Sequence, residues 1–252
     1  MTAFIPEPVP DFAFLLVFGS VYFGIVSRRR RPPKSKNPPK KWQHLSESLA
    51  AFHRNGWQGL RRIIHGVFYK PKQSVFGELR PSETEIIKPY LFDQGKRNAY
   101  ITGTALYNNL GLTTQVPKTV KIASRSKRIY ISSGSIKAKP VKSYVDVTEE
   151  NYYLLEILDV LKDFTKIPDL DKKGGILFLQ NKLRSLTDKE INRLINFALQ
   201  YPPRVRAFLG ALLTDITGLE NNSLKQSVNP LTTYDFGINK ELLETAPNWN
   251  IK

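Results

Sequence analysis

Basic side chains cluster on both sides of a His65-Gly66 turn, where the chain has the pattern of a short hairpin. Apolar and β-branched residues in 60–64 and 67–69 favour two strands around this turn. Cations on such a hairpin can bind phosphates, which gives affinity and salt dependence without reading the base sequence. The predicted phosphate-binding residues are Arg54, Arg61, Arg62, Lys70 and Lys72.

A helix is expected immediately before this hairpin. Leu45, Leu49 and Phe52 recur at helical spacing, and Asn55-Gly56 is a typical helix end. A helix followed by a basic hairpin is the order of the second half of a winged helix, in which the helix side chains contact bases. The polar side chains available for that role are Glu47, Ser48 and His53, of which Ser48 and His53 are the predicted DNA-binding residues.

The net charge supports a polyanionic partner. The chain has 38 Lys and Arg against 22 Asp and Glu, for a formal charge of +16. Residues 28–80 alone carry fourteen Lys and Arg against two Glu, which gives +12. DNA, RNA and an anionic membrane all fit this charge. A basic surface that serves only solubility is the alternative interpretation, and for His65 a turn role is favoured over a functional one.

The sequence contains none of the common catalytic motifs. It lacks a Gly-rich phosphate loop, a His-Glu-x-x-His pair and a Gly-x-Ser-x-Gly turn, and it has no cysteine. Its three histidines, His44, His53 and His65, lie within one basic segment, which argues against a zinc site. We therefore expect no enzyme activity, no cofactor and no metal. Asp159 and Asp163 are expected to lie on the solvated exterior of a helix, at i and i+4.

The first 43 residues form an atypical N-terminal segment. Residues 12–26, from Phe12 to Val26, are almost entirely apolar and precede four arginines, Arg28 to Arg31. A spanning helix needs about 20 apolar residues, so a membrane anchor is one alternative, beside a buried hydrophobic segment or a non-native start. Residues 32–41 contain four prolines, a pattern that indicates a basic linker. The expected location is cytoplasmic, with anchoring through the apolar run as the alternative.

The remaining sequence predicts a sheet followed by helices. Ser82 with Glu85 is a capping box, and a short helix is expected over 103–109. Alternation of apolar and polar residues over 117–145, with a turn at 133–135, predicts a small antiparallel sheet with one solvent-exposed, basic face. Helical spacing predicts three helices: one over 148–164, one that begins after a Thr187/Glu190 capping box, and one over 203–217. Residues 219–252 are expected to be an extended tail.

Four segments resemble the AbiEi-like antitoxin family, the DUF6088 type: 61–72, 76–79, 100–117 and 201–207. The resemblance covers about 45–218 and implies a winged helix-turn-helix that binds repeats in its own promoter, with the recognition helix near 45–55 and the wing near 60–70. It also implies a C-terminal domain that counteracts a nucleotidyltransferase-like toxin in a type IV, bacterial phage-defence system, without direct binding being required. The family's usual two supporting helices have no counterpart in 1–43, so we expect DNA binding to be weakened or lost if this N-terminus is the native one.

The resulting prediction is an α+β chain in four parts. Residues 1–43 are the apolar segment and linker, 44–80 a partial winged helix, 81–218 a mixed antitoxin-like domain with a C-terminal helical bundle, and 219–252 the tail. The expected function is an antitoxin and transcriptional autoregulator. The alternatives are a membrane-anchored basic interaction protein and, as a third class, an enzyme on the C-terminal domain.

Overall fold

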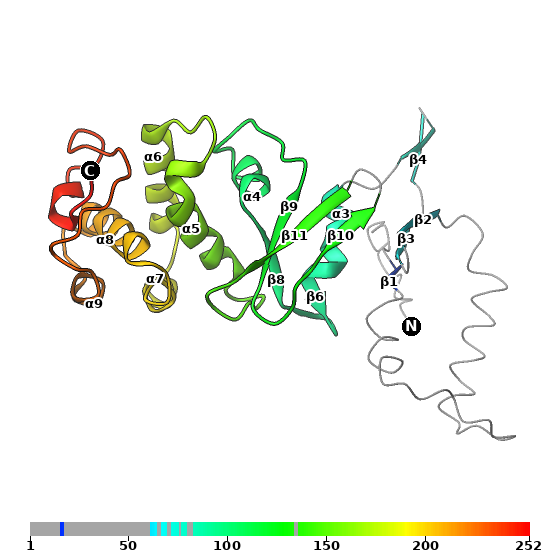
Figure 1. Ribbon diagram of the computed structural model, residues 1–252, viewed down its shortest axis with the longest axis horizontal. Helices are drawn as coiled ribbons and strands as arrows, with labels where there is room; N and C mark the ends of the chain where they lie inside the picture. The colour runs from blue at the N-terminus through cyan, green and yellow to red at the C-terminus, as the bar shows by residue number, and fades with distance from the viewer. Residues whose placement is uncertain are drawn as a thin grey trace, which may run out of the picture. The chain divides into compact units, whose positions relative to one another are not determined.

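The computed structural model describes residues 16–17, 61–64, 67–69, 72–75, 77–79, 83–133 and 136–252 (Figure 1). The chain divides into two compact units, 1–94 and 95–252. Both short strands and helices occur, which confirms the α+β class in this coarse sense.

The first unit contains a three-stranded sheet in the order β1-β3-β2. Its strands are β1 (Leu16–Val17), β2 (Arg61–Ile64) and β3 (Val67–Tyr69), and both pairings are antiparallel. The pairing of β2 with β3 is the one that the sequence predicts around residues 65–66. A second antiparallel pair, β4 (Lys72–Ser74) and β5 (Gly77–Leu79), follows, and then α3 (Glu83–Ile87), η1 (Lys88–Leu91) and β6 (Phe92–Asp93).

The second unit begins with β7 (Lys96–Arg97) and a four-stranded sheet in the order β10-β11-β9-β8. The strands are β8 (Ala99–Thr102), β9 (Val120–Ser124), β10 (Ile131–Ser133) and β11 (Ile136–Lys142). The predicted antiparallel sheet is wrong in one respect, because β9 and β11 pair in parallel. Alternation identifies strands but not their directions, and here β11, the second arm of the β10–β11 pair, runs beside β9.

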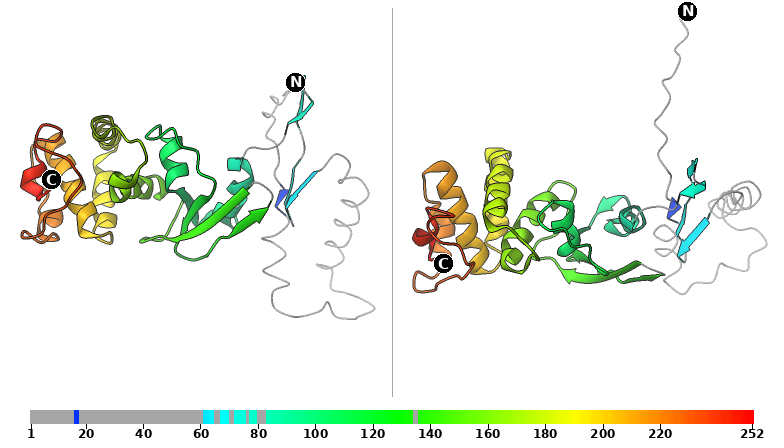
Figure 2. Two further views of the ribbon diagram at one scale, coloured as in Figure 1. Left: turned by 45° about the horizontal axis from the view of Figure 1, so that its top comes forward. Right: turned by 90° about the horizontal axis from the view of Figure 1, so that it is seen from above.

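Helices make up most of the rest of this unit. They are α4 (Thr104–Asn109), α5 (Tyr152–Asp163), η2 (Phe164–Lys166), α6 (Lys172–Arg184), α7 (Asp188–Ala198), α8 (Pro203–Thr217), α9 (Asn222–Gln226) and η3 (Ala246–Trp249). The views of Figures 1 and 2 place α5 between the sheet and the helices α7 and α8, and α5 contacts β8, α7 and α8.

Local capping explains where several of these helices begin and end. The Thr187/Glu190 capping box predicted at the start of α7 is present, and Gly218 ends α8 in the left-handed conformation at φ 71°. Helix α6 was not among the expected elements. It begins at Asp171, whose carboxylate accepts hydrogen bonds from the backbone N–H groups of Lys173 and Gly174.

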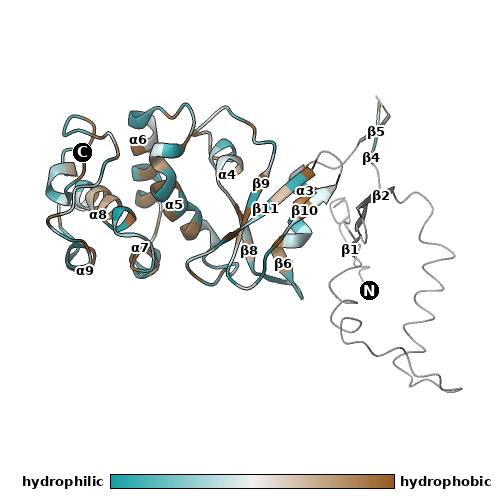
Figure 3. Cartoon of the chain, in the orientation of Figure 1, coloured by the Kyte–Doolittle hydropathy of each residue, from teal (hydrophilic) through white to brown (hydrophobic). Residues whose placement is uncertain are grey.

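The hydrophobic core of the second unit lies among α5, α6, α7 and α8. Leu154, Leu158 and Phe208 are fully buried within it, and Phe208 contacts the rings of Phe164 and Phe236 at centroid distances of 4.9 and 4.7 Å. Figure 3 shows hydrophobic and hydrophilic residues alternating along these helices, as expected for helices that bury one face. In the described part of the chain, no helix combines the length and apolar character needed to cross a bilayer.

The expectation of an extended tail is wrong, because 219–252 is packed onto α8. Phe236 and Trp249 are 0% and 1% exposed. The backbone N–H of Tyr234 donates to the carbonyl of Asn250, and that of Lys252 donates to the carbonyl of Tyr234. The apolar side chains of this segment are isolated rather than periodic, so the sequence pattern gives no sign of their burial.

Trp249 fixes this segment at Gly210 of α8. Its indole N–H donates to the Thr214 hydroxyl at 3.1 Å, and its ring lies directly over Gly210, where an added Cβ would overlap the ring atoms. We expect Gly210→Ala to lower the free energy of unfolding by about 1–3 kcal/mol, because the buried ring has no space to move. Chemical denaturation measures this. Trp249→Leu in the same chain should reduce the cost of Gly210→Ala, and strictly additive effects would contradict the contact.

Candidate nucleic-acid interface

The structure describes only part of the predicted DNA-binding set. Ser48, His53, Arg54 and Lys70 lie outside the described residues. Arg61 and Arg62 are the first two residues of β2 and pair with Tyr69 and Phe68 of β3, and Lys72 is the first residue of β4. The strands thus bring two of the predicted arginines into one hairpin.

A second basic surface, which the sequence predicted as one face of a sheet, lies on the second unit. Lys121 of β9 and Lys137 and Lys139 of β11 are exposed. Lys121 and Lys139 occupy directly paired positions on neighbouring strands. Such pairs share a face of the sheet, so these like charges lie side by side. This confirms the expected solvent-exposed, basic face of the sheet.

The same face is covered by helices at its other end. Tyr100 and Thr102 of β8 are 1% and 2% exposed, and Thr102 is paired with Lys121. The stem of Lys121 passes close to Gly103, where an added Cβ would lie 2.8 Å from the Lys121 Cδ. Gly103 has a φ of 70° and is the N-cap of α4. A residue without a side chain therefore allows α4 to follow β8 directly beside this lysine.

A buried carboxylate holds the covered end together. Asp159 of α5 is 2% exposed, and its Oδ2 accepts hydrogen bonds from the Tyr100 hydroxyl at 2.9 Å and the Thr102 hydroxyl at 2.6 Å. Its Oδ1 accepts from the Lys162 ammonium at 2.5 Å. A buried charge is tolerated when it is both paired and hydrogen-bonded, and Asp159 meets both conditions.

The expectation that Asp159 and Asp163 lie on a solvated helix exterior is therefore wrong. Asp159 is buried, and the Asp163 Oδ2 accepts a hydrogen bond from the Tyr107 hydroxyl of α4 at 2.8 Å. The i, i+4 spacing correctly places both carboxylates on one face of α5, but that face packs against β8 and α4. The available sequence signal was the polar pair Tyr100 and Thr102 on alternate positions of an otherwise apolar strand.

The ionisation of this cluster follows from burial. Burial raises the pKa of Tyr100, and the neighbouring Asp159 carboxylate raises it further, so Tyr100 stays a hydrogen-bond donor. Burial also raises the pKa of Tyr107, together with Asp163. For Lys162, burial lowers the pKa, but the charge and hydrogen bond of the Asp159 carboxylate, together with Asp163 and Tyr144, outweigh this effect and the net pKa is raised. The lysine therefore stays a cation, and its role is structural.

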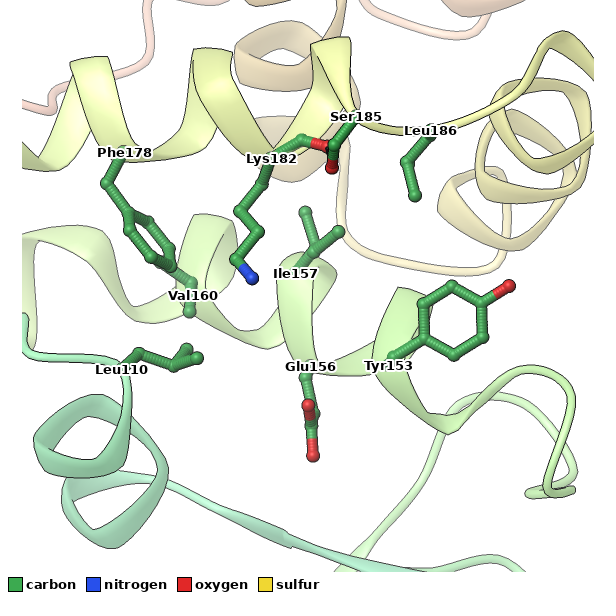
Figure 4. A pocket seen from close by; sticks show the side chains of 9 residues that line it. All are labelled: Leu110, Tyr153, Glu156, Ile157, Val160, Phe178, Lys182, Ser185 and Leu186. Atoms are coloured by element: carbon green, nitrogen blue, oxygen red, sulfur yellow. Dashed lines mark hydrogen bonds between the residues drawn. The ribbon is translucent and has the colours of Figure 1, made fainter.

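A small cavity of about 140 Å³ lies between α5 and α6 (Figure 4). It is lined by Leu110, Tyr153, Glu156, Ile157, Val160, Phe178, Lys182, Ser185 and Leu186. Lys182 reaches from α6 toward α5, and Glu156 lies on the α5 side. Burial raises the pKa of Glu156 to about 7, with Asp159 contributing and with Arg97 and Lys182 opposing. Glu156 can therefore gain or lose a proton near neutral pH.

The hydroxyl groups that line this cavity are hydrogen-bonded to other residues, that of Tyr153 to Glu190 and that of Ser185 to the Lys182 carbonyl. Among the hydrogen bonds of the described part, Glu156 has none to a hydroxyl that it could activate as a nucleophile. The described residues also include no group of three or more His, Asp or Glu side chains placed to hold a metal ion.

Part of this chain is similar to a sequence family. Residues 50–166 match the model described as "Family of unknown function (DUF6088)". This supports the DUF6088 part of the resemblance, whereas no named relative supports its antitoxin part. The RV2827C protein from Mycobacterium tuberculosis has a similar solved structure, with a TM-score of 0.48, 12% sequence identity, and coverage of 82% of this chain and 78% of that one. Comparison with curated proteins gives no match.

A substitution at Asp159 tests how much its contacts stabilise the second unit. Asp159→Asn leaves the part-buried Lys162 without its counter-charge, so we expect a loss of about 2–3 kcal/mol in the free energy of unfolding. Denaturant titration measures it. Asp146→Asn is the matched control, because Asp146 is 83% exposed and its ion pair with Arg125 is a surface contact. Equal effects of the two substitutions would show that Asp159 is not a central contact.

The raised pKa of Glu156 can be tested through the pH dependence of stability. Its folded pKa of about 7 lies above the ordinary value of 4.5, so between these values the folded state binds more protons than the unfolded state. Stability should therefore fall as pH rises from about 4.5 to 7. We expect Glu156→Gln to be more stable than the parent chain by about 1–2 kcal/mol at pH 8 and equal to it near pH 4.

The measurement is the unfolding free energy of both chains across pH. Glu150→Gln is the control, since the Glu150 side chain is 84% exposed. A difference between parent and Glu156→Gln that does not change with pH would contradict the raised pKa.

Proposed function

We propose that this chain is a non-enzymatic regulator that binds the DNA upstream of its own gene through the basic hairpin of the first unit. The observation that carries the proposal is the position of Arg61 and Arg62 on β2, within the segment 28–80 that holds +12 of the net charge. Arginine on a hairpin can bind the phosphates beside a groove while a preceding helix contacts bases.

The sheet order of the first unit supports a winged-helix interpretation. The strand β1 precedes the expected recognition helix 45–55 in sequence and pairs with β3 of the hairpin. In a winged helix, a short strand from before the recognition helix completes the sheet that carries the wing. In this proposal residues 60–70 are the wing, and Ser48 and His53 act from the recognition helix.

The second part of the proposal is an antitoxin role for the second unit, against a nucleotidyltransferase-like toxin of a type IV system. Its support is the resemblance of 100–117 and 201–207 to the AbiEi-like family, together with the DUF6088 match over 50–166. Growth rescue tests it: co-expression of this chain with such a toxin from the neighbouring gene should restore growth. No single residue is assigned to neutralisation.

Promoter binding is tested with the full chain on its own upstream DNA and on scrambled DNA of equal length, across a salt series. We expect preference for the upstream DNA near physiological salt. Arg61→Gln with Arg62→Gln should weaken binding to both and reduce the slope of log K against log salt by about 1.8, for two lost phosphate contacts.

The matched control is Lys189→Gln with Lys240→Gln, which removes the same charge at exposed positions of the second unit. This control should leave the salt slope unchanged. Equal, steeply salt-dependent binding to both DNAs would contradict a promoter-specific role and leave only a phosphate-binding arm.

A further inference from the structure

A continuous stretch of the second unit is free of negative charge. Residues 95–145 contain ten Lys and Arg and no Asp or Glu. This stretch includes every strand of the four-stranded sheet, and the positive charge therefore concentrates on that sheet and its connections. It lies outside the basic segment 28–80.

The exposed lysines of the sheet are not neutralised by neighbours. Lys121, Lys137 and Lys139 are exposed, and none of them has an ion pair within the described part of the chain. Lysines used only for fold stability are expected to lie near carboxylates, as Lys162 does. These three instead present their charge to solvent, where a polyanion can reach it.

An exposed aromatic side chain lies beside these lysines. Tyr130 is 70% exposed, while its neighbours Ile129 and Ile131 are 8% and 5% exposed. Burial alternates through the segment, because Arg128 and Ser132 are also exposed. The two buried isoleucines hold the backbone, so the Tyr130 ring projects from a fixed position on the open face.

The strand register aligns the ring with the lysines. Ile131 pairs with Ala138 and Ser132 with Lys137, so continuing this antiparallel register by one residue places Tyr130 opposite Lys139. Lys139 in turn pairs with Lys121. Tyr130, which directly precedes β10, therefore lies in one row with Lys139 of β11 and Lys121 of β9, and this row spans about 10 Å at ordinary strand spacing. We call this row the Tyr130 row.

We propose that the Tyr130 row is a binding site for single-stranded nucleic acid, with the lysines on the phosphates and the Tyr130 ring stacked on a base. A duplex keeps its base faces inside the stack, so an exposed ring on the face of a sheet has no base to stack on. A single strand offers both unstacked bases and a backbone that the lysines can follow. The site goes beyond the promoter contact proposed above, because it uses none of that contact's residues.

The test measures binding of the full chain to a fluorescent 12-nucleotide oligouridylate, the matching oligothymidylate and a 12-base-pair duplex. Tyr130→Ala should weaken binding to the single strands about 5- to 150-fold, with no change in salt slope, because stacking is lost but no charge is. Tyr130→Phe keeps the ring and should bind like the parent chain. The tighter of the two single strands identifies RNA or DNA as the ligand.

Charge is tested separately from stacking. Lys121→Gln with Lys139→Gln should reduce the salt slope on single strands by about 1.4, whereas the control pair Lys189→Gln with Lys240→Gln should not. Ultraviolet cross-linking of the oligouridylate gives the location, and we expect the cross-link within residues 129–137. Far-UV circular dichroism and the unfolding midpoint confirm that each variant is folded.

The proposal is overturned if Tyr130→Ala binds single strands like the parent chain, or if the cross-links fall only outside 129–137. It is also overturned if the lysine pair weakens duplex and single strands equally while Tyr130→Ala has no effect, since the face then binds phosphates alone. Failure of the promoter proposal is a different result, because it is read from Arg61 and Arg62 on upstream duplex DNA.

Discussion

The buried Asp159 carboxylate is the contact on which the second unit depends. It accepts hydrogen bonds from Tyr100 and Thr102, which lie 59 and 57 residues away in sequence, and it is paired with Lys162 one turn along α5. A buried carboxylate without such partners is strongly unfavourable, so these hydrogen bonds fix the position of α5 relative to β8. Hydrogen bonds to a charged group each contribute about 1.5–3 kcal/mol, more than a neutral pair does.

This contact also divides one face of the sheet into a covered end and an open end. Tyr100, Thr102 and Ala123 face the helices and are buried, whereas Lys121 and Lys139, in the next positions of the same face, are exposed. The cover ends where α4 follows β8 at Gly103. A helical layer that is packed and hydrogen-bonded onto β8 therefore supports the sheet from which the lysines project, and a binding surface on such an element keeps its geometry without a ligand.

The helical part of this unit is closed by its C-terminal segment rather than by another long helix. Phe236 extends the aromatic contacts of Phe164 and Phe208, and Trp249 occupies the space over Gly210. The short helices and turns of 219–252 are stable because these few large side chains are fully buried. The segment is thus a structural part of the core.

Local chemistry in the sequence determined much of this protein. Alternating residues predicted the strands β9, β10 and β11 and the basic face that their polar positions form, and the Thr187/Glu190 capping box predicted the start of α7. These features depend on residues within a few positions of one another, so a single sequence contains them in full. The pairing of β2 with β3 joins two strands that are close in sequence and is local in the same sense.

Only the tertiary structure decided the features that join distant segments. Asp159 became a buried partner of Tyr100 and Thr102, β11 paired in parallel with β9, and Trp249 packed over Gly210. Helical spacing places Asp159 on a face of α5 but does not say whether that face meets water or another element. Which surfaces meet depends on contacts between residues that lie 18 to 59 positions apart, and local periodicity does not specify the partners of those contacts.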